Sequence, residues 1–243
     1  MKIISYILSP IFALVFILIL LIFHPIQWFS FNVFGYSAHK AVVDLMNGFL
    51  TRSLLILGIN VKRENKVDIP TKRTIIFVSN HQGLFDIPPI IWYFRKHHAK
   101  FVSKKELGKG IPSVSYNLRH GGAALIDRKD GKSAILELMK FGEKLNKNTW
   151  SAAIFPEGTR SRDGKPKSFS PNGLKMLIKK NPNALVVPLS INNSWKVFKY
   201  GKFPLGLFSP ITIYTHDPIE VNSMNFNEIF ELTESKIKSK IRV

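Results

Sequence analysis

The chain has 243 residues, which suits one α/β domain of ordinary size with a small appendage, and 45% of them are hydrophobic. It contains no cysteine, which excludes a disulfide framework, a thiolate metal site and a cysteine nucleophile. Lysine and arginine number 35 against 16 aspartate and glutamate residues, a net charge of +19. This charge favours anionic partners such as lipid headgroups, phosphorylated substrates or acidic carrier proteins, unless it serves only solubility. The basic residues form no dense arm, so nucleic acid is not an expected partner.

An apolar segment opens the chain. Residues 3–23 carry no charge, and a membrane-spanning helix needs roughly 20 apolar residues. A cleaved signal peptide is the main alternative, but its apolar region usually has about 7 to 15 residues and ends in a small-residue cleavage site. Here an aromatic stretch follows instead, as at a membrane interface: Trp28, Phe29, Phe31 and Phe34. We therefore expect membrane-embedded helices at 1–59 and an α/β domain at 60–243.

How the first segment meets the membrane is left open. Pro10 should kink a helix that includes it, and Pro25 should end one. A second, amphipathic segment at 41–59 carries Asp44 and Arg52. The two segments either cross the bilayer or form a helical hairpin in one leaflet. Lysine and arginine are dense after residue 60, so the positive-inside rule places the bulk of the chain on the cytoplasmic side of the inner membrane.

The rest of the chain alternates short β-rich runs with helical stretches. The predicted strands lie at 74–79, at the start of 100–107, and at 123–128, 151–158, 184–193 and 211–221. The predicted helices lie at 87–97, 132–145, 173–180 and 225–241. This order predicts an α/β fold with a mixed central sheet flanked by helices. Pro188 favours an edge strand or a bulge at 184–193. Sites in such sheets gather at strand ends, and three predicted strands end in polar clusters, at 80–86, 127–128 and 156–161.

The first cluster, "NHQGLFD", contains His81 and Asp86. A histidine that acts as a base needs one free ring nitrogen, while an oxygen holds the other and so fixes the tautomer. Asp86 can reach His81 if the chain turns at Gly83. Alternatively, Asp86 caps the helix that begins near residue 87, and the spacing alone does not decide between the two. We expect four other histidines, which lack such a pattern, on the surface: His97, His98, His120 and His216.

The cluster "FPEGTRS" at 155–161 predicts a tight loop. Pro156 and Gly158 shape it and expose backbone N–H groups, and Arg160 offers a planar fork for phosphate. Glu157 is placed to accept a hydrogen bond from a hydroxyl or to hold an arginine. A solvated turn with a surface ion pair is the alternative. The stretch "GGAALIDR" at 121–128 is predicted to end a strand and to bring the cation of Arg128 to the same end of the sheet as Arg160. The alternative is a salt bridge at the end of that strand.

Taken in order, "NHQGLFD", "GAALIDR", "FPEGTRS" and "VVPLSI" resemble the four sequence blocks of the glycerolipid acyltransferase family, and most closely its bacterial 1-acylglycerol-3-phosphate acyltransferases. The resemblance runs from roughly residue 70 to 220. One departure is Leu125, where an aromatic residue or isoleucine is commoner. The resemblance implies transfer of an acyl chain from acyl-CoA or acyl-carrier protein to the sn-2 hydroxyl of 1-acylglycerol-3-phosphate, which gives phosphatidic acid.

The resemblance also implies roles for residues. His81 would take the proton from the acceptor hydroxyl, and Asp86 would orient His81. No metal or cofactor is implied, and a backbone N–H near Gly158 is a candidate oxyanion donor. The implied substrate-binding residues are Asn80, Lys105, Arg128, Glu157, Gly158, Thr159 and Arg160.

Two other functions are considered. The acceptor is another lysolipid, such as lyso-ornithine lipid, or the chain is a membrane lipid-binding protein without catalysis. The His81–Asp86 pair argues against the second, because a pure binder has no use for a base. A thioesterase or lipase-like hydrolase would need the sequence Gly-x-Ser-x-Gly, which is missing.

Overall fold

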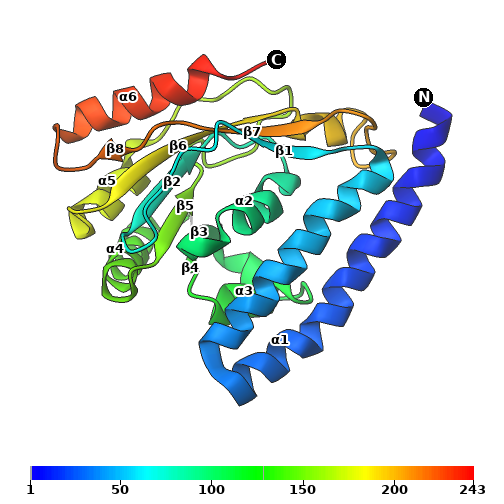
Figure 1. Cartoon of the computed structure of the whole chain (residues 1–243), viewed down its shortest axis with the longest axis horizontal. Coiled ribbons are helices and arrows are strands. Elements are labelled where there is room, and N and C mark those ends of the chain that lie inside the picture. Colours follow the sequence, from blue (N-terminus) through cyan, green and yellow to red (C-terminus); the bar gives the residue numbers. More distant parts are fainter. Residues whose placement is uncertain (1, 128) are drawn as a thin grey trace.

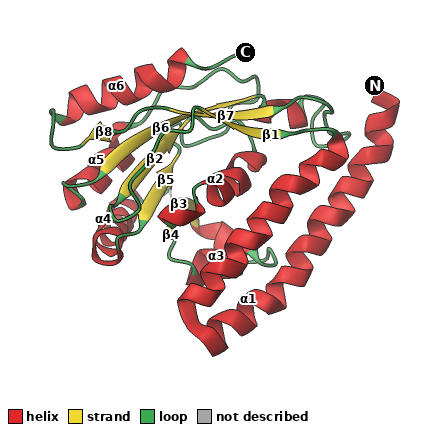
Figure 2. Ribbon diagram, in the orientation of Figure 1, coloured by secondary structure: helices red, strands yellow, loops and turns green. Residues whose placement is uncertain are grey.

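The computed structural model describes residues 2–127 and 129–243, and these residues form an eight-stranded sheet with helices on both faces (Figures 1 and 2). In order across the sheet the strands are β1 (Val61–Glu64), β7 (Ile211–Thr215), β6 (Leu185–Asn192), β2 (Ile75–Ser79), β5 (Ser151–Ile154), β3 (Ala99–Lys104) and β4 (Ala124–Ile126), while β8 (Ile219–Glu220) pairs with β6. Strand β6 runs antiparallel to β7 and β8, and the other neighbours are parallel. The predicted mixed α/β sheet is confirmed.

Helices cover both faces of the sheet. The α-helices are α1 (Lys2–Ser53), α2 (Ile87–Tyr93), α3 (Val114–His120), α4 (Gly131–Asn148), α5 (Pro171–Lys180) and α6 (Phe226–Ser239). One core packs α1 and α2 against the sheet, and a second core packs α4, α5 and α6 against the opposite face. Strand β2 is therefore buried at every residue, as expected of a strand covered on both sides.

Helix α1 folds back on itself as two arms that meet at a bend (Figure 1). The prediction that Pro25 ends the first helix is wrong, because the helix runs through Pro10 and Pro25 and has non-helical backbone at Gly35, with φ 78° and ψ −166°. Glycine takes a positive φ without a steric penalty, so the chain turns there. A proline inside a helix costs about 3 kcal/mol, and we attribute its tolerance here to the packing of the first arm on the domain.

Contacts with the domain hold the first arm near both prolines. The Leu205 backbone N–H donates to Ser9 Oγ at 2.8 Å. The Ser113 hydroxyl donates to the Leu20 carbonyl at 2.7 Å. In the described part of the chain, one helical stretch, Lys2–Leu57, is long and apolar enough to cross a membrane by length and composition. The division into 1–59 and 60–243 stays a prediction, and the first arm of α1 contributes Phe12 to the core of the sheet.

The prediction of an edge strand at Pro188 is wrong, since β6 lies inside the sheet between β7 and β2. The alternative of a bulge agrees with the register, because Leu189 pairs with Thr215 and Val186 with Ile219, which leaves one extra residue opposite Pro188. The predicted strand 211–221 is instead two strands, β7 and β8, which both pair with β6. The Pro188 carbonyl accepts from the His216 backbone N–H at 3.0 Å, between these two strands. The backbone N and O of one strand residue point to the same side of the strand. The nitrogen of Pro188, which has no N–H, therefore faces the interruption between β7 and β8, where no strand hydrogen bond is needed.

The expectation that the unpaired histidines lie on the surface is wrong for His216, which is 6% exposed. Its Nε2 lies 2.8 Å from the hydroxyl of Ser190 on β6. His97 and His98 are half-buried, and His120 is exposed as expected. The sequence contains no sign of the Ser190 contact, because the two residues meet only when β6 and β7 pair.

Candidate active site

The carboxyl ends of β2, β5, β3, β4 and β6 lie at one edge of the sheet, because these strands run in the same direction. The chain leaves β2 at residue 80, β5 at residue 155 and β3 at residue 105. Parallel pairing therefore collects the polar clusters that the sequence separates by dozens of residues.

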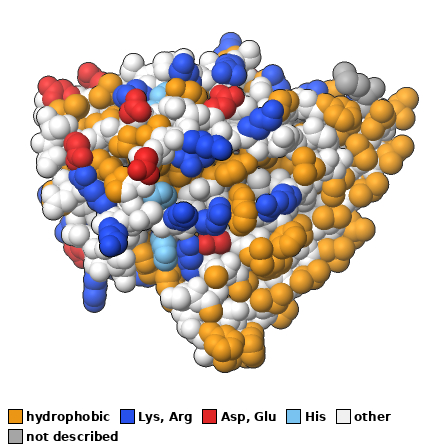
Figure 3. All heavy atoms as spheres, viewed as in Figure 1, with side chains coloured by type: hydrophobic (Ala, Val, Ile, Leu, Met, Phe, Trp, Pro, Cys, Tyr) orange, Lys and Arg blue, Asp and Glu red, His pale blue; other side chains and the backbone are white. Residues whose placement is uncertain are grey.

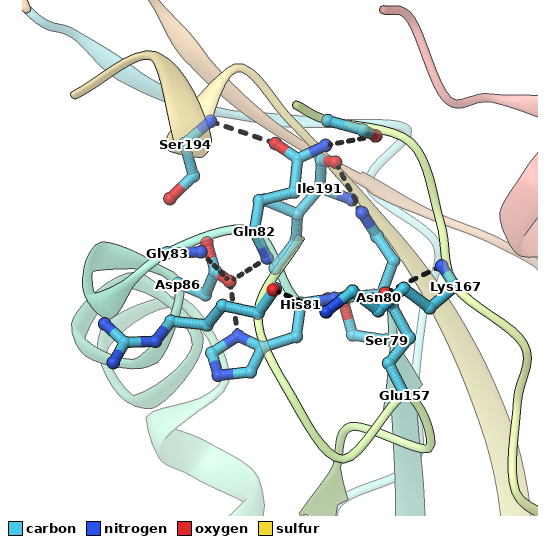
Figure 4. Close-up of polar contacts among 12 residues, drawn as sticks. Ser79, Asn80, His81, Gln82, Gly83, Asp86, Glu157, Lys167, Ile191 and Ser194 are labelled. Atoms are coloured by element: carbon cyan, nitrogen blue, oxygen red, sulfur yellow. Dashed lines mark hydrogen bonds and ion pairs between the residues drawn. The ribbon is translucent and has the colours of Figure 1, made fainter. Parts of the chain in front are cut away.

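His81 and Asp86 form a hydrogen-bonded pair at this edge (Figure 4). His81 Nδ1 lies 2.7 Å from Asp86 Oδ2, and the Asp86 side chain is fully buried while that of His81 is 16% exposed. Asp86 Oδ2 also accepts the backbone N–H groups of Gln82 at 2.7 Å and Gly83 at 2.9 Å. A carboxylate held by two backbone donors stays in place to accept a third hydrogen bond, from Nδ1–H of His81. This arrangement fixes the tautomer that leaves Nε2 with a free lone pair.

The alternative of Asp86 as a cap for α2 is wrong, because its side chain makes no capping hydrogen bond to that helix. An N-cap side chain accepts from the second or third residue of the helix. In α2 these residues are Pro88 and Pro89, which have no N–H to donate. The sequence therefore already contained the signal that removes the cap interpretation.

The loop after β5 fixes the backbone of His81 from both sides. The His81 N–H donates to Glu157 Oε1 at 2.7 Å, and the Ser161 N–H donates to the His81 carbonyl at 2.8 Å. The ring of Phe155 stacks on the imidazole, with the centroids 4.1 Å apart and the planes 13° apart. These three contacts set both the position and the plane of the imidazole.

Glu157 has both carboxylate oxygens engaged by backbone groups. Oε2 accepts the Lys167 backbone N–H at 2.9 Å, while Oε1 accepts that of His81. Burial raises the pKa of Glu157 above its ordinary value. Its carboxylate therefore joins the loop to the histidine, and we regard it as a positioning residue rather than as a group directed at substrate.

Asn80 also holds the loop in position. It is fully buried. Its side chain donates to the Ile191 carbonyl at 2.9 Å and accepts the Ile191 N–H at 2.7 Å, which fastens the loop to β6. Gln82, which sequence analysis did not single out, accepts from the Ser194 N–H at 3.1 Å and donates to the Gly164 carbonyl at 3.3 Å (Figure 4).

The predicted phosphate-binding residues lie at the rim. Arg160 and Thr159 are exposed, and the Arg160 guanidinium forms no hydrogen bond or ion pair within residues 2–127 and 129–243. Lys105 is exposed just after β3. Arg128 lies outside the described residues. The Gly158 N–H donates to the Phe155 carbonyl at 3.0 Å, with φ 67° at Gly158, so this group closes a turn and is engaged rather than directed at an oxyanion.

An apolar cavity of about 240 Å³ lies beside the pair, between α1, α2, α3 and β3. Leu84 and Ile87, which flank Asp86 in sequence, line one end of it. Phe101 of β3 also lines it and lies 6.0 Å, between ring centroids, from Phe155, the residue stacked on His81. The apolar wall also includes Leu20, Val43, Leu50, Ile91, Leu107 and Val114.

The fold and this edge of the sheet define an α/β domain with a hydrogen-bonded histidine–aspartate pair beside an apolar cavity. The sequence profile described as Acyltransferase matches residues 60–192, more than half of the chain. The chain therefore belongs to the acyltransferase family of enzymes.

Several proteins of known name are similar to this chain. The 1-acyl-sn-glycerol-3-phosphate acyltransferase of Helicobacter pylori is 34% identical over 59% of this chain and 57% of its own length. That of Borreliella burgdorferi is 29% identical over 78% of this chain and 73% of its own length. The crystal structure of the 1-acyl-sn-glycerophosphate acyltransferase from Thermotoga maritima superposes with a TM-score of 0.76 at 26% identity, covering 98% of this chain and 93% of that one.

Proposed function

We propose that the chain transfers a fatty acyl group to the sn-2 hydroxyl of 1-acylglycerol-3-phosphate and so forms phosphatidic acid. The observation that carries the proposal is the His81–Asp86 pair, with Nδ1 held at 2.7 Å and Nε2 left for substrate. The relatives named for this reaction supply the substrate class. The donor is acyl-CoA or acyl-carrier protein, whose thioesters carry the same reacting carbonyl.

The proposed reaction needs one base and no metal or cofactor, because the thioester is already activated. His81 Nε2 takes the proton from the acceptor hydroxyl as its oxygen attacks the thioester carbonyl. The new C–O bond forms a tetrahedral intermediate, and Asp86 stabilises the imidazolium. The C–S bond then breaks, and the thiolate leaves with the proton that His81 carried. No covalent link to the enzyme forms.

The acceptor phosphate is bound by the cationic rim in this proposal. Arg160 offers two parallel N–H donors, the geometry that suits a phosphate. Thr159 and Lys105 lie at the same rim, and Lys167 is held near it by Thr159 Oγ1, 2.9 Å from Lys167 Nζ. Glu157 and Asn80 contribute by holding the loops, and Gly158 by its positive φ. Arg128 stays a predicted member of this group.

The apolar cavity takes the acyl chain. It begins beside Asp86 and runs along β3 between the arms of α1 and the sheet. Apolar lining suits a hydrocarbon chain, whose burial contributes about 0.8 kcal/mol per methylene. Phe101 lines the cavity and contacts Phe155, the residue stacked on His81, and this contact supports a binding mode with the first carbons of the chain near His81.

The α1 hairpin attaches the enzyme to one leaflet of the inner membrane, with the sheet on the cytoplasmic side. Its outer face is apolar, as Figure 3 shows along the right-hand side of the molecule. Exposed residues there include Ile3, Ile7, Ile11, Leu14, Leu18, Leu21, Ile22, Trp28 and Phe29. The inner face packs on the domain at Phe12 of the first arm and at Gly48 of the second arm, which lies against the Trp92 ring of α2. A hairpin that is packed on the domain along both arms cannot also cross the bilayer.

The experiment is acyl transfer to lysophosphatidic acid by the purified protein in vesicles, with acyl-CoA and acyl-carrier protein tested in parallel. The variant is His81→Ala, and the matched control is His120→Ala, an exposed histidine of α3. Phosphatidic acid from wild type and from the control, but not from His81→Ala, is the expected result. Near wild-type turnover by His81→Ala would overturn the mechanism. Product with another lysolipid alone would change the acceptor and keep the base.

A further inference from the structure

The cavity has a second end whose chemistry the acyltransferase reaction does not use. Beyond the apolar wall, its lining becomes polar and charged: His39, Lys40 and Asp44 from α1, Arg95 and His98 from the segment that leads into β3, and Lys100 from β3 itself. Strand β3 begins at Ala99, and its carboxyl end points to the catalytic edge. This cationic cluster therefore lies at the amino end of β3, opposite His81.

The positive charges of the cluster are only partly balanced. Asp44, the one acidic residue that lines the described part of the cavity, lies 2.5 Å from Lys40 Nζ. The ammonium group of Lys100 lies 5.0 Å from the ring centroids of Tyr36 and Trp150 and forms no ion pair with the described residues. Burial, and then the charge of Lys40, lower the pKa of Lys100 to about 7. An anion in the cavity would restore the charged form.

A buried histidine of the cluster has no hydrogen-bond partner among the described residues. His39 is 0% exposed. Among residues 2–127 and 129–243, neither of its ring nitrogens has a hydrogen-bond partner. His98 Nδ1 is also buried without a partner there. Buried polar atoms are nearly always hydrogen-bonded in folded proteins, so these nitrogens point to a ligand that brings oxygen atoms into the cavity.

We propose that the cavity binds a free long-chain fatty acid, with its carboxylate at the cationic cluster and its chain along the apolar wall. A carboxylate supplies the acceptor oxygens that Lys100 and His39 lack, and a hydrocarbon chain matches the rest of the lining. Leu50 lies eleven residues after His39 on the same helical arm, which corresponds to about 16 Å at 1.5 Å per residue. The cavity is therefore long enough for many methylene groups.

This binding mode has a consequence for catalysis, and the consequence rests on the proposed function. The fatty acid fills the space assigned to the acyl chain, so both cannot bind together. Free fatty acid therefore acts as an inhibitor that competes with the acyl substrate. An enzyme that consumes acyl thioesters would then slow when these are hydrolysed to free acid.

The test is direct binding of palmitate labelled with carbon-13 at the carboxyl carbon, followed by NMR on the purified full-length protein in detergent micelles. Lys100→Met removes the charge and keeps the length of the side chain, and Lys100→Arg keeps the charge. Lys62→Met is the matched control, since Lys62 is an exposed lysine on β1, at the other edge of the sheet. Methyl palmitate, added as a competitor, tests the need for a carboxylate.

We expect palmitate to bind wild type, Lys100→Arg and Lys62→Met with the same affinity. We expect it to bind Lys100→Met at least about tenfold more weakly, because a hydrogen bond to a charged group is lost. Methyl palmitate should compete poorly. Equal affinity of Lys100→Met, no bound signal with wild type, or equal competition by the ester would each overturn the proposal. Turnover is measured in the same preparations. If turnover is present without palmitate binding, only this inference fails, and if binding is present without turnover, only the proposed function fails.

Discussion

Replacing Asp86 by asparagine tests how the buried carboxylate acts on His81. The oxygen that faces His81 Nδ1 also accepts two backbone N–H groups, from Gln82 and Gly83. Those donors require an oxygen at that position, so they should hold the amide oxygen of the new side chain there and turn its NH₂ group away. His81 then keeps the tautomer with Nε2 free, and only the negative charge is lost.

The size of the effect follows from that geometry. Hydrogen bonds to charged groups contribute about 1.5–3 kcal/mol, and each 1.36 kcal/mol is about tenfold in rate. We therefore expect kcat to fall about 10- to 150-fold. A substitution that also reverses the tautomer costs about 10⁴-fold in the serine protease triad. The NH₂ group occupies the site of Asp86 Oδ1, which is buried and has no partner among the described residues, so stability should fall by no more than about 1–3 kcal/mol.

The assay is steady-state acyl transfer at saturating lysophosphatidic acid, together with urea denaturation of each variant. Glu157→Gln is the matched control, because Glu157 is also a carboxylate removed in part from solvent, and it accepts two backbone N–H groups. It does not touch the imidazole ring, so its kcat should fall less than that of Asp86→Asn. An unchanged kcat for Asp86→Asn would refute charge stabilisation of the imidazolium. A loss of about 10⁴-fold in the folded variant would refute the argument that backbone donors hold the tautomer.

Three other changes have defined outcomes. His81→Ala should lower kcat by about 10²–10⁴-fold, the usual contribution of a general base, while circular dichroism and vesicle sedimentation stay as in wild type. Arg160→Ala should raise the KM for the acceptor about tenfold or more by loss of a charged hydrogen bond to phosphate, with kcat nearly unchanged, and an unchanged KM would contradict the phosphate role. Lys100→Met should flatten the pH dependence of stability. The pKa of Lys100 is lowered from 10.5 to about 7 in the folded protein, so the unfolded chain binds more protons between these values and wild-type stability rises with pH there. Urea denaturation at about pH 7 and about pH 10 measures this difference, and an equal slope in both proteins would refute it.

Local sequence predicts the His81–Asp86 hydrogen bond but not the contacts that surround it. His81 and Asp86 are five residues apart, and Pro88 and Pro89 remove the donors that a capping aspartate would need. The pairing thus follows from a short stretch of chain. The contacts of His81 with Glu157, Ser161 and Phe155 join segments more than 70 residues apart, and no local pattern predicts them.

The errors of prediction have the same origin. Proline at 188 looks like an edge residue because it lacks an N–H, yet β6 is central and the interruption between β7 and β8 accommodates it. Pro25 looks like a helix end, yet the helix continues to Gly35. In both places, pairing and packing with distant segments override the local preference of a proline.

The sequence by itself determined the alternating α/β pattern, the apolar first segment and the four sequence blocks, because each depends on hydrophobic period or on residues a few positions apart. Tertiary structure alone decided that α1 is a hairpin packed on the domain, that the side chains of Glu157 and Asn80 form hydrogen bonds with backbone groups, and that an apolar cavity ends in a cationic cluster. These features arise where strands and helices remote in sequence meet, and side-chain burial and hydrogen-bond partners are set there.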